Sequence, residues 1–461
     1  MPIRLPSFVL LLPLLLLAAL APAVRTQAQA PVSQAPVKTT LPNGLRLLVK
    51  PESDTPLVAI DVFVRAGAPQ ESASDAGIGS FVAQTLFAST TDSTPEVVAR
   101  DINALGGNVA ATWHPDWTQI AALTVKDKLG DALFLLTDTL KNADFDPAVV
   151  EDVRNQALTA LDGRDADLFQ TAYGGLQKTL YAGTSYARPE GGTRANLLRL
   201  TRADLRGYFT RYYVPNNLVV VVVGNVTPDE VIRQVTDDLG DFPRAGRAAP
   251  GFAEPLPPLT RDLPPVRLFQ PDLDQQIVLA GVRAAPVASP DYPALLVANA
   301  LLGGMKSGRL FTQLREKEGL GYDLGSVYDP RLAAGDLAGY VLGAPTKTDP
   351  ATKKEVPTVG PMKDGLLRLF AGFGDAPPTP AALSRAQHFL IGAYKIRHER
   401  LEDRAALLGA AELSAPDGYK LDSDYAAYIN AVTGADVQRV ARKYFAHPVV
   451  STVEPVATGG G

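Results

Sequence analysis

The chain has 461 residues, enough for two to four domains of about 150 residues each. Its composition, 46% hydrophobic and 20% charged, is that of a folded protein with a sizeable core, which excludes disorder throughout. A net charge of −5 excludes a basic nucleic-acid footprint.

Residues 1–30 have the pattern of a signal peptide. Arg4 supplies a positive start, residues 8–21 form an apolar run too short for a relaxed bilayer span, and small residues follow as far as Ala30. We therefore expect an exported, periplasmic protein, with an uncleaved membrane anchor as the alternative. No long apolar stretch follows, so we expect no membrane span after signal removal.

The first half, residues 31–242, is expected to alternate strands and helices. Asn43-Gly44 is the favoured dipeptide for a tight turn and predicts a hairpin over residues 39–50. A helix is expected at residues 77–90, with Ser74 or Asp75 as its N-cap. The further strands are expected at 57–66, within 106–124 and at 218–223, and the further helices at 95–105, 131–140, 147–161 and 201–211.

A proline- and glycine-rich segment, residues 243–265, carries no periodicity and is the expected hinge linker. After it, residues 266–461 repeat the same order of elements, beginning with a strand at 276–283 and a helix at 292–302. This repetition indicates duplication. The expected fold is α+β, with two homologous halves that each contain mixed β-sheets flanked by helices.

The helix at residues 77–90, GIGSFVAQTLFAST, resembles the zinc-binding helix of the insulinase/pitrilysin-type metallopeptidases, the family that includes mitochondrial-processing-peptidase-like proteins. That resemblance implies a clamshell of two halves. In the family, two histidines one turn apart hold zinc and a glutamate activates water. These positions fall here on Ser80, Gln84 and Ala83, and a third ligand, a downstream glutamate, falls on Ala160.

None of these four positions carries a side chain that ligates zinc well or takes a proton, so we expect a degenerate site that binds no metal. A peptidase with ligands elsewhere is the competing hypothesis. It is disfavoured because the chain has four histidines and no cysteine, and no two histidines are spaced as a ligand pair. The closest approach to one, His398 beside Glu399, is expected to lie on a solvated helix face.

Residues 301–322, LLGGMKSGRLFTQLREKEGLGY, resemble a second family motif whose arginine and tyrosine contact the substrate backbone and the oxyanion near zinc. These residues match Arg315 and Tyr322, which are expected to act in trans from a helix end and the following strand. The alternative is structural, with Arg315 in a salt bridge and Tyr322 in a core.

The resemblance also implies an edge strand to which a substrate peptide adds by backbone hydrogen bonds. The residues expected to bind substrate in this way are Asn108, Ala110, Ala111 and Thr112. An ordinary strand, with Trp113 and Trp117 packing a core, is the alternative.

Loss of the zinc ligands with retention of the Arg/Tyr pair resembles the heterodimeric branch of the family. We therefore expect a non-catalytic subunit, inactive alone, whose homologous partner carries the zinc. The alternative is an inactive peptide-binding or scaffold protein without a peptidase partner. The sequence does not identify the peptide substrate.

Overall fold

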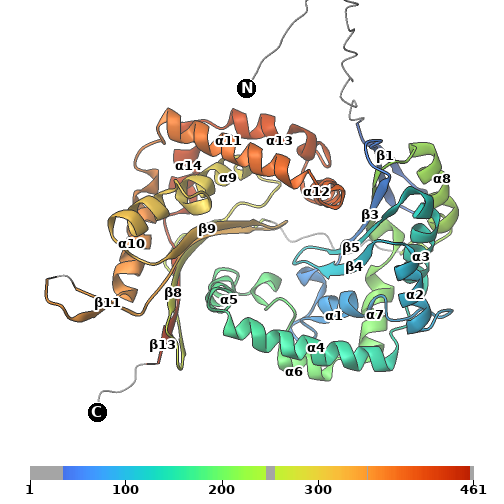
Figure 1. Ribbon diagram of the computed structural model, residues 1–461, viewed down its shortest axis with the longest axis horizontal. Helices are drawn as coiled ribbons and strands as arrows, with labels where there is room; N and C mark the ends of the chain where they lie inside the picture. Colours follow the sequence, from blue (N-terminus) through green and yellow to red (C-terminus); the bar gives the residue numbers. More distant parts are fainter. Residues whose placement is uncertain (1–34, 246–254, 350, 457–461) are drawn as a thin grey trace, which may run out of the picture. The chain divides into compact units, whose positions relative to one another are not determined.

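The computed structural model describes residues 35–245, 255–349 and 351–456, which form two large β-sheets with helices on their faces (Figure 1). Each sheet contains both parallel and antiparallel pairs, so the predicted α+β class with mixed sheets is confirmed. The predicted leader and residues 246–254 of the predicted linker lie outside the described residues. Within the described ranges, no helix combines the length and the apolar character needed to cross a membrane.

The first sheet has six strands within the described residues. In spatial order they are β1 (Val37–Thr40), β2 (Arg46–Pro51), β6 (Leu218–Gly224), β3 (Leu57–Val64), β5 (Thr118–Val125) and β4 (Asn108–Trp113). The predicted hairpin is confirmed, and Gly44 in its turn has φ +91°, a conformation that favours glycine. Every residue of β6 is buried, as its unbroken apolar sequence predicts.

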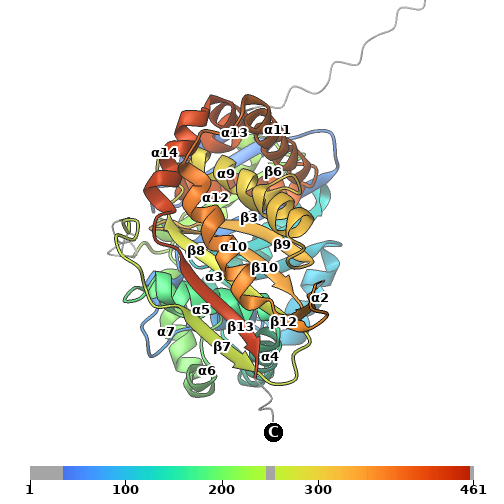
Figure 2. The ribbon, with the colours of Figure 1, turned by 90° about the vertical axis from the view of Figure 1, so that its left-hand side faces the viewer.

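Among the described residues, the second sheet has the same topology without an equivalent of β1, and Figure 2 shows its strands side by side. Its order is β7 (Val266–Gln270), β13 (Val449–Pro455), β8 (Gln276–Ala284), β10 (Gly335–Gly343) and β9 (Asp323–Pro330). In both sheets the last strand of the half, β6 or β13, pairs parallel on one side and antiparallel on the other. This shared arrangement supports the predicted duplication.

Helices cover the sheets on both faces. Those of the first half are α1 (Ile78–Thr85), α2 (Pro95–Ala104), α3 (Leu129–Asn142), α4 (Pro147–Ala166), α5 (Leu168–Leu180), α6 (Arg194–Arg199), α7 (Arg202–Tyr212) and α8 (Pro228–Leu239). Those of the second half are α9 (Tyr292–Asn299), α10 (Val359–Ala371), α11 (Pro380–Arg397), α12 (Leu401–Ser414), α13 (Lys420–Ala431) and α14 (Gly434–Tyr444). Thr201 caps α7 as predicted, by accepting a hydrogen bond from the backbone N–H of Asp204.

Each half contributes one helix to the sheet of the other half. The helix α5 packs against β8 and β13, where Leu176 and Leu180 join the core of the second sheet. The helix α12 packs against β3 and β6, where Leu401 and Leu408 join the core of the first sheet. The core on one face of each sheet therefore contains side chains from both halves of the sequence.

Ion pairs hold α12 on the first sheet. The carboxylate of Glu412, only 2% exposed, lies 2.9 Å from the Arg46 guanidinium and 2.7 Å from the Lys38 ammonium. Near the other end of the helix, Arg404 pairs with Glu52. Because burial makes a carboxylate depend on its partners, these contacts fix where α12 lies on the sheet.

Candidate functional site

The helix with the predicted metal-site positions, α1, begins two to three residues later than the N-cap prediction required. Ser74 and Asp75 do not cap it; its N-cap is Gly77, with φ +98°. The free N–H groups of Gly77 and Gly79 donate to the buried carboxylate of Glu71, at 2.9 and 3.0 Å. Burial raises the pKa of Glu71 to about 7, against the lowering effect of these two donors. The N-cap prediction was wrong because an acid six residues upstream does the capping.

Ser80 and Gln84 keep the spacing of a ligand pair on α1. The Gln84 amide donates a 3.0 Å hydrogen bond to the Ser80 hydroxyl, so the two side chains lie together on the outer face of the helix. Ala83 is instead buried, and Ala160 is exposed on α4, which packs against α1. A hydroxyl, a carboxamide and two methyl groups do not fit the zinc that the motif would hold.

The described residues contain no group of three histidine, aspartate or glutamate side chains placed to hold a metal ion. Three of the four histidines have structural partners instead. His398 is not on a solvated helix face: its Nε2 lies 2.9 Å from the Asp422 carboxylate and its Nδ1 lies 2.8 Å from the Tyr394 carbonyl oxygen. His447 pairs with Asp262, and His114 packs on the Trp117 ring.

The predicted substrate strand, β4, is an edge strand of the first sheet. It pairs with β5 on one side, and Asn108, Ala110 and Thr112 are exposed along it while Ala111 is half-buried. The helix α1 packs against β4. The edge thus has the geometry that addition of a peptide strand requires.

The tryptophans of the alternative hypothesis also pack as it expects. The ring of Trp117 packs on Phe63 at 6.2 Å between centroids, and Trp113 borders the backbone of Gly79 in α1. Core packing and an open strand edge are therefore compatible, and substrate binding by these residues stays a prediction.

Arg315 and Tyr322 lie side by side, as the second motif predicts. Arg315 belongs to a π-helical segment, Leu310–Lys317, and Tyr322 directly precedes β9. The Arg315 guanidinium donates to the backbone carbonyl oxygen of Tyr322 and lies 5.2 Å from the centroid of the Phe311 ring. The reversal between them is made by two glycines with positive φ, Gly319 and Gly321.

Both side chains of this pair reach solvent. Tyr322 is 45% exposed, and Arg315 forms no ion pair within the described residues. The structural alternative, with Arg315 in a salt bridge and Tyr322 in a core, is therefore not what the structure shows. Neither residue has a hydrogen bond or ion pair to Ser80 or Gln84 in the part of the chain that the structure describes. The catalytic role of the pair stays a prediction.

The sequence analysis missed a buried polar network that joins the two halves. Asp336 on β10, with no exposed surface, accepts hydrogen bonds from Tyr173 at 2.6 Å and Tyr181 at 2.9 Å, both from the first half. Burial raises the pKa of Asp336 to about 6. No local sequence signal identifies such a residue, because its partners lie more than 150 positions away.

Arg331 lies beside Asp336 in the same network. Its guanidinium, 4% exposed, pairs with Asp329 at 2.9 Å and lies over the rings of Tyr181 and Tyr186. The hydroxyl of Tyr186 donates to Asp116, whose other carboxylate oxygen accepts the backbone N–H of Leu332 at 2.9 Å. The cation offsets the buried acids, and the network connects loops of both sheets.

Comparison with known proteins agrees with this fold. Residues 46–194 match the model of the insulinase family, peptidase M16, and residues 199–390 match that of the peptidase M16 inactive domain. The chain is thus built as a peptidase-like protein over both halves. It belongs to the insulinase family, M16.

Some relatives in this family are named as proteases, and another is named as a subunit of a larger complex. An uncharacterized zinc protease of Mycobacterium leprae is 30% identical over 323 residues, 70% of this chain and 72% of that protein. Cytochrome b-c1 complex subunit 1 of Homo sapiens is 26% identical, over 57% of this chain and 54% of that protein. A protease from Helicobacter pylori shares the fold, with a TM-score of 0.82, 20% identity and coverage of 91% of this chain and 100% of that one.

Proposed function

We propose that this chain is the non-catalytic subunit of a heterodimeric, periplasmic zinc peptidase. Its partner is a homologous subunit that carries the zinc ligands and the general base. This chain binds the peptide substrate along β4 and supplies Arg315 and Tyr322 to the partner's zinc site. Alone, it is inactive.

One combination of features carries the proposal. The metal-site positions on α1 and α4 hold no ligand, yet Arg315 and Tyr322 remain together, exposed and without an acidic partner for the guanidinium in the described residues. A guanidinium and a phenol with free donors suit a carbonyl oxygen that becomes an oxyanion during peptide hydrolysis. Donors of this kind contribute only where another subunit supplies the activated water.

The edge of β4 gives the substrate a place on this chain. Backbone pairing recognises extended peptides without selecting particular side chains, which suits a subunit that helps to degrade or process many sequences. Export is supported by the signal-peptide pattern of residues 1–30.

The experiment compares the purified mature chain, alone and with a zinc-bearing homologue from the same genome. Zinc content, complex formation and cleavage of a quenched-fluorescence peptide library are measured. We expect the lone chain to be metal-free and inert, and the pair to cleave. In the pair, Arg315→Ala and Tyr322→Phe should each lower kcat/KM by about 10²–10³-fold.

Lys317→Ala is the matched control, since Lys317 is an exposed cation of the same segment whose ammonium donates a hydrogen bond to Gln313. Its kcat/KM should stay within about twofold of the unsubstituted pair. Stoichiometric zinc and cleavage by the lone chain would overturn the proposal, and so would a pair whose activity is indifferent to Arg315 and Tyr322.

A second candidate is a scaffold protein of the same fold without a peptidase partner. It is favoured by the similarity to a cytochrome b-c1 complex subunit, which its name places in a larger assembly. Stable association with a protein that lacks the zinc motif, without peptide cleavage, would support this candidate over the first.

A further inference from the structure

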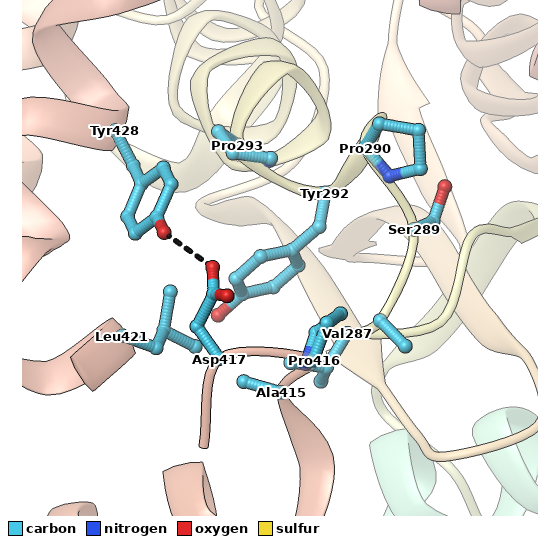
Figure 3. A pocket seen from close by; sticks show the side chains of 11 residues that line it. Val287, Ser289, Pro290, Tyr292, Pro293, Ala415, Pro416, Asp417, Leu421 and Tyr428 are labelled. Carbon is cyan, nitrogen blue, oxygen red and sulfur yellow. Dashed lines mark hydrogen bonds between the residues drawn. The ribbon is translucent and has the colours of Figure 1, made fainter. Parts of the chain in front are cut away.

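A surface pocket lies in the second half, at residues that neither the metal-site motif nor the Arg/Tyr pair includes. It is bounded by the loop before α9, the loop after α12 and the helix α13 (Figure 3). Its volume of about 350 Å³ is in the range of about 300–1,000 Å³ that is common for ligand sites. This feature is independent of the proposed function.

The walls of the pocket are mostly apolar and stiff. Val287 and Pro290 contribute from the loop before α9, Pro293 from the first turn of α9, and Pro416 and Leu421 from the opposite side. Proline rings do not change rotamer as longer side chains do, so the pocket is largely preformed. An apolar group that enters it loses little freedom on the protein side.

One carboxylate gives the pocket its charge. Asp417 is held by the hydroxyl of Tyr428, which donates to Oδ2 at 2.9 Å. Within the described residues, the carboxylate has no further side-chain hydrogen bond and no ion pair with a lysine, arginine or histidine. Its second oxygen therefore remains available to a ligand that donates hydrogen bonds.

Two aromatic rings flank this carboxylate. Figure 3 shows Tyr428 and Tyr292 on the two sides of Asp417, with Tyr292 between Asp417 and Pro290 in this view. The Tyr292 hydroxyl forms no hydrogen bond within the described part of the chain, and burial raises its pKa to about 12, so it is neutral at pH 7. Aromatic faces beside a carboxylate attract a cation and tolerate the methylene groups that carry it.

We propose that this pocket binds a peptide segment that presents an arginine or lysine side chain next to an apolar side chain. The cationic head pairs with the free oxygen of Asp417 between the two tyrosine rings. The stem and the neighbouring apolar side chain lie against Val287 and the prolines. The pocket thus serves as a docking site for basic peptides outside the peptidase site.

The test uses fluorescein-labelled Gly-Leu-Arg-Leu-Gly-Ser and the same peptide with citrulline in place of arginine, which keeps the shape and loses the charge. Binding to the full mature chain is measured by fluorescence anisotropy. We expect the arginine peptide to bind at least tenfold more tightly than the citrulline peptide. Its affinity should fall as salt rises from 0.05 to 0.3 M, because the ion pair is partly exposed.

Variants locate the binding. Asp417→Asn keeps a group that accepts the Tyr428 hydrogen bond and removes the charge, so the preference for arginine over citrulline should disappear. Ala415→Trp fills the pocket from its lining, and binding of both peptides should be lost. Asp229→Asn is the control, because it makes the same change in net charge at an exposed residue of α8.

The proposal is overturned if the two peptides bind equally to the unsubstituted chain, or if neither binds. The proposal is also overturned if the Asp417→Asn variant still prefers the arginine peptide over the citrulline peptide. The same holds if Asp229→Asn removes this preference as fully as Asp417→Asn does. Circular dichroism and thermal melting of each variant show that the fold is retained, and Tyr428→Phe provides a second, milder change at the same carboxylate.

Discussion

The side-chain amide of Gln119 on β5 donates a hydrogen bond of 3.0 Å to the carboxylate of Asp61 on β3, which is only 1% exposed. The acid lies under α12, whose Glu402 and Asp403 add two further negative charges. Desolvation is the largest of the effects that raise the pKa of Asp61, and the two negative charges add to it. Together they raise this pKa to about 8, although the hydrogen bond from Gln119 lowers it. Asp61 is therefore protonated in the folded protein at pH 7.

This pKa gives a pH dependence with a definite sign. Between about pH 4 and pH 8 the unfolded state has ionised Asp61 and the folded state has not, so stability falls as pH rises. Asp61→Asn removes the proton uptake and keeps the acceptor for Gln119. We expect it to raise the free energy of unfolding by roughly 4 kcal/mol at pH 7 and to leave it unchanged below pH 4. Urea unfolding at a series of pH values tests this, and a pH-independent difference would contradict it.

Gly409 of α12 is in contact with Phe63 on β3. A Cβ at Gly409 would lie 2.7 Å from the Cζ atom of the Phe63 ring, and nearer still to its Cε2 and Cδ2 atoms. We expect Gly409→Ala to destabilise the protein by about 1–3 kcal/mol, since a buried ring with fixed neighbours has nowhere to move. The control is Gly392→Ala on α11, where the added Cβ meets nothing within 4 Å. That change should stabilise by about 0.5–1 kcal/mol, and equal effects of both would refute the close packing of α12.

Glu412 is the acid that fixes α12 to the first strands of the chain. Glu412→Gln leaves Arg46 and Lys38 without their carboxylate, and we expect a loss of about 1–3 kcal/mol. The figure is below that for a fully buried pair because both cations are partly exposed. Glu318→Gln, which breaks a surface pair with Arg368, should change stability by less than about 0.5 kcal/mol. Denaturant unfolding of the two variants makes the comparison, and a Glu412→Gln effect no larger than the control would count against this account.

Refilling the predicted metal-site positions tests their assignment. Ser80→His and Gln84→His, combined with Ala160→Glu, place two imidazoles one turn apart on α1 and a carboxylate on the neighbouring α4. We expect this triple variant to retain zinc at one ion per chain after dialysis. Moving the carboxylate by one position, with Thr159→Glu in place of Ala160→Glu, should weaken zinc binding at least tenfold. Equal binding by both would show that the alignment of Ala160 is wrong.

Local sequence patterns predict the helices and strands of this fold well, but they do not predict which distant side chains come into contact. The apolar run of β6 and the glycine turn at Gly44 follow from neighbouring residues alone. The partners of Asp336 do not, because an aspartate in a strand gives no sign that tyrosines from the other half will surround it. Glu71 was missed for a similar reason: it looks like an ordinary loop acid, and only the positive φ of Gly77 brings the N–H groups of α1 onto it.

The exchange of α5 and α12 between the halves has a consequence for the order of folding. When the last strand of the first sheet has been synthesised, the face that carries Phe63 and Val221 still lacks its covering helix, which lies about 180 residues later in the chain. This face of the first sheet cannot be covered until nearly the whole chain has been synthesised. Folding therefore depends on contacts between distant segments, which makes it slow, and it leaves an apolar sheet face open to other chains in the meantime.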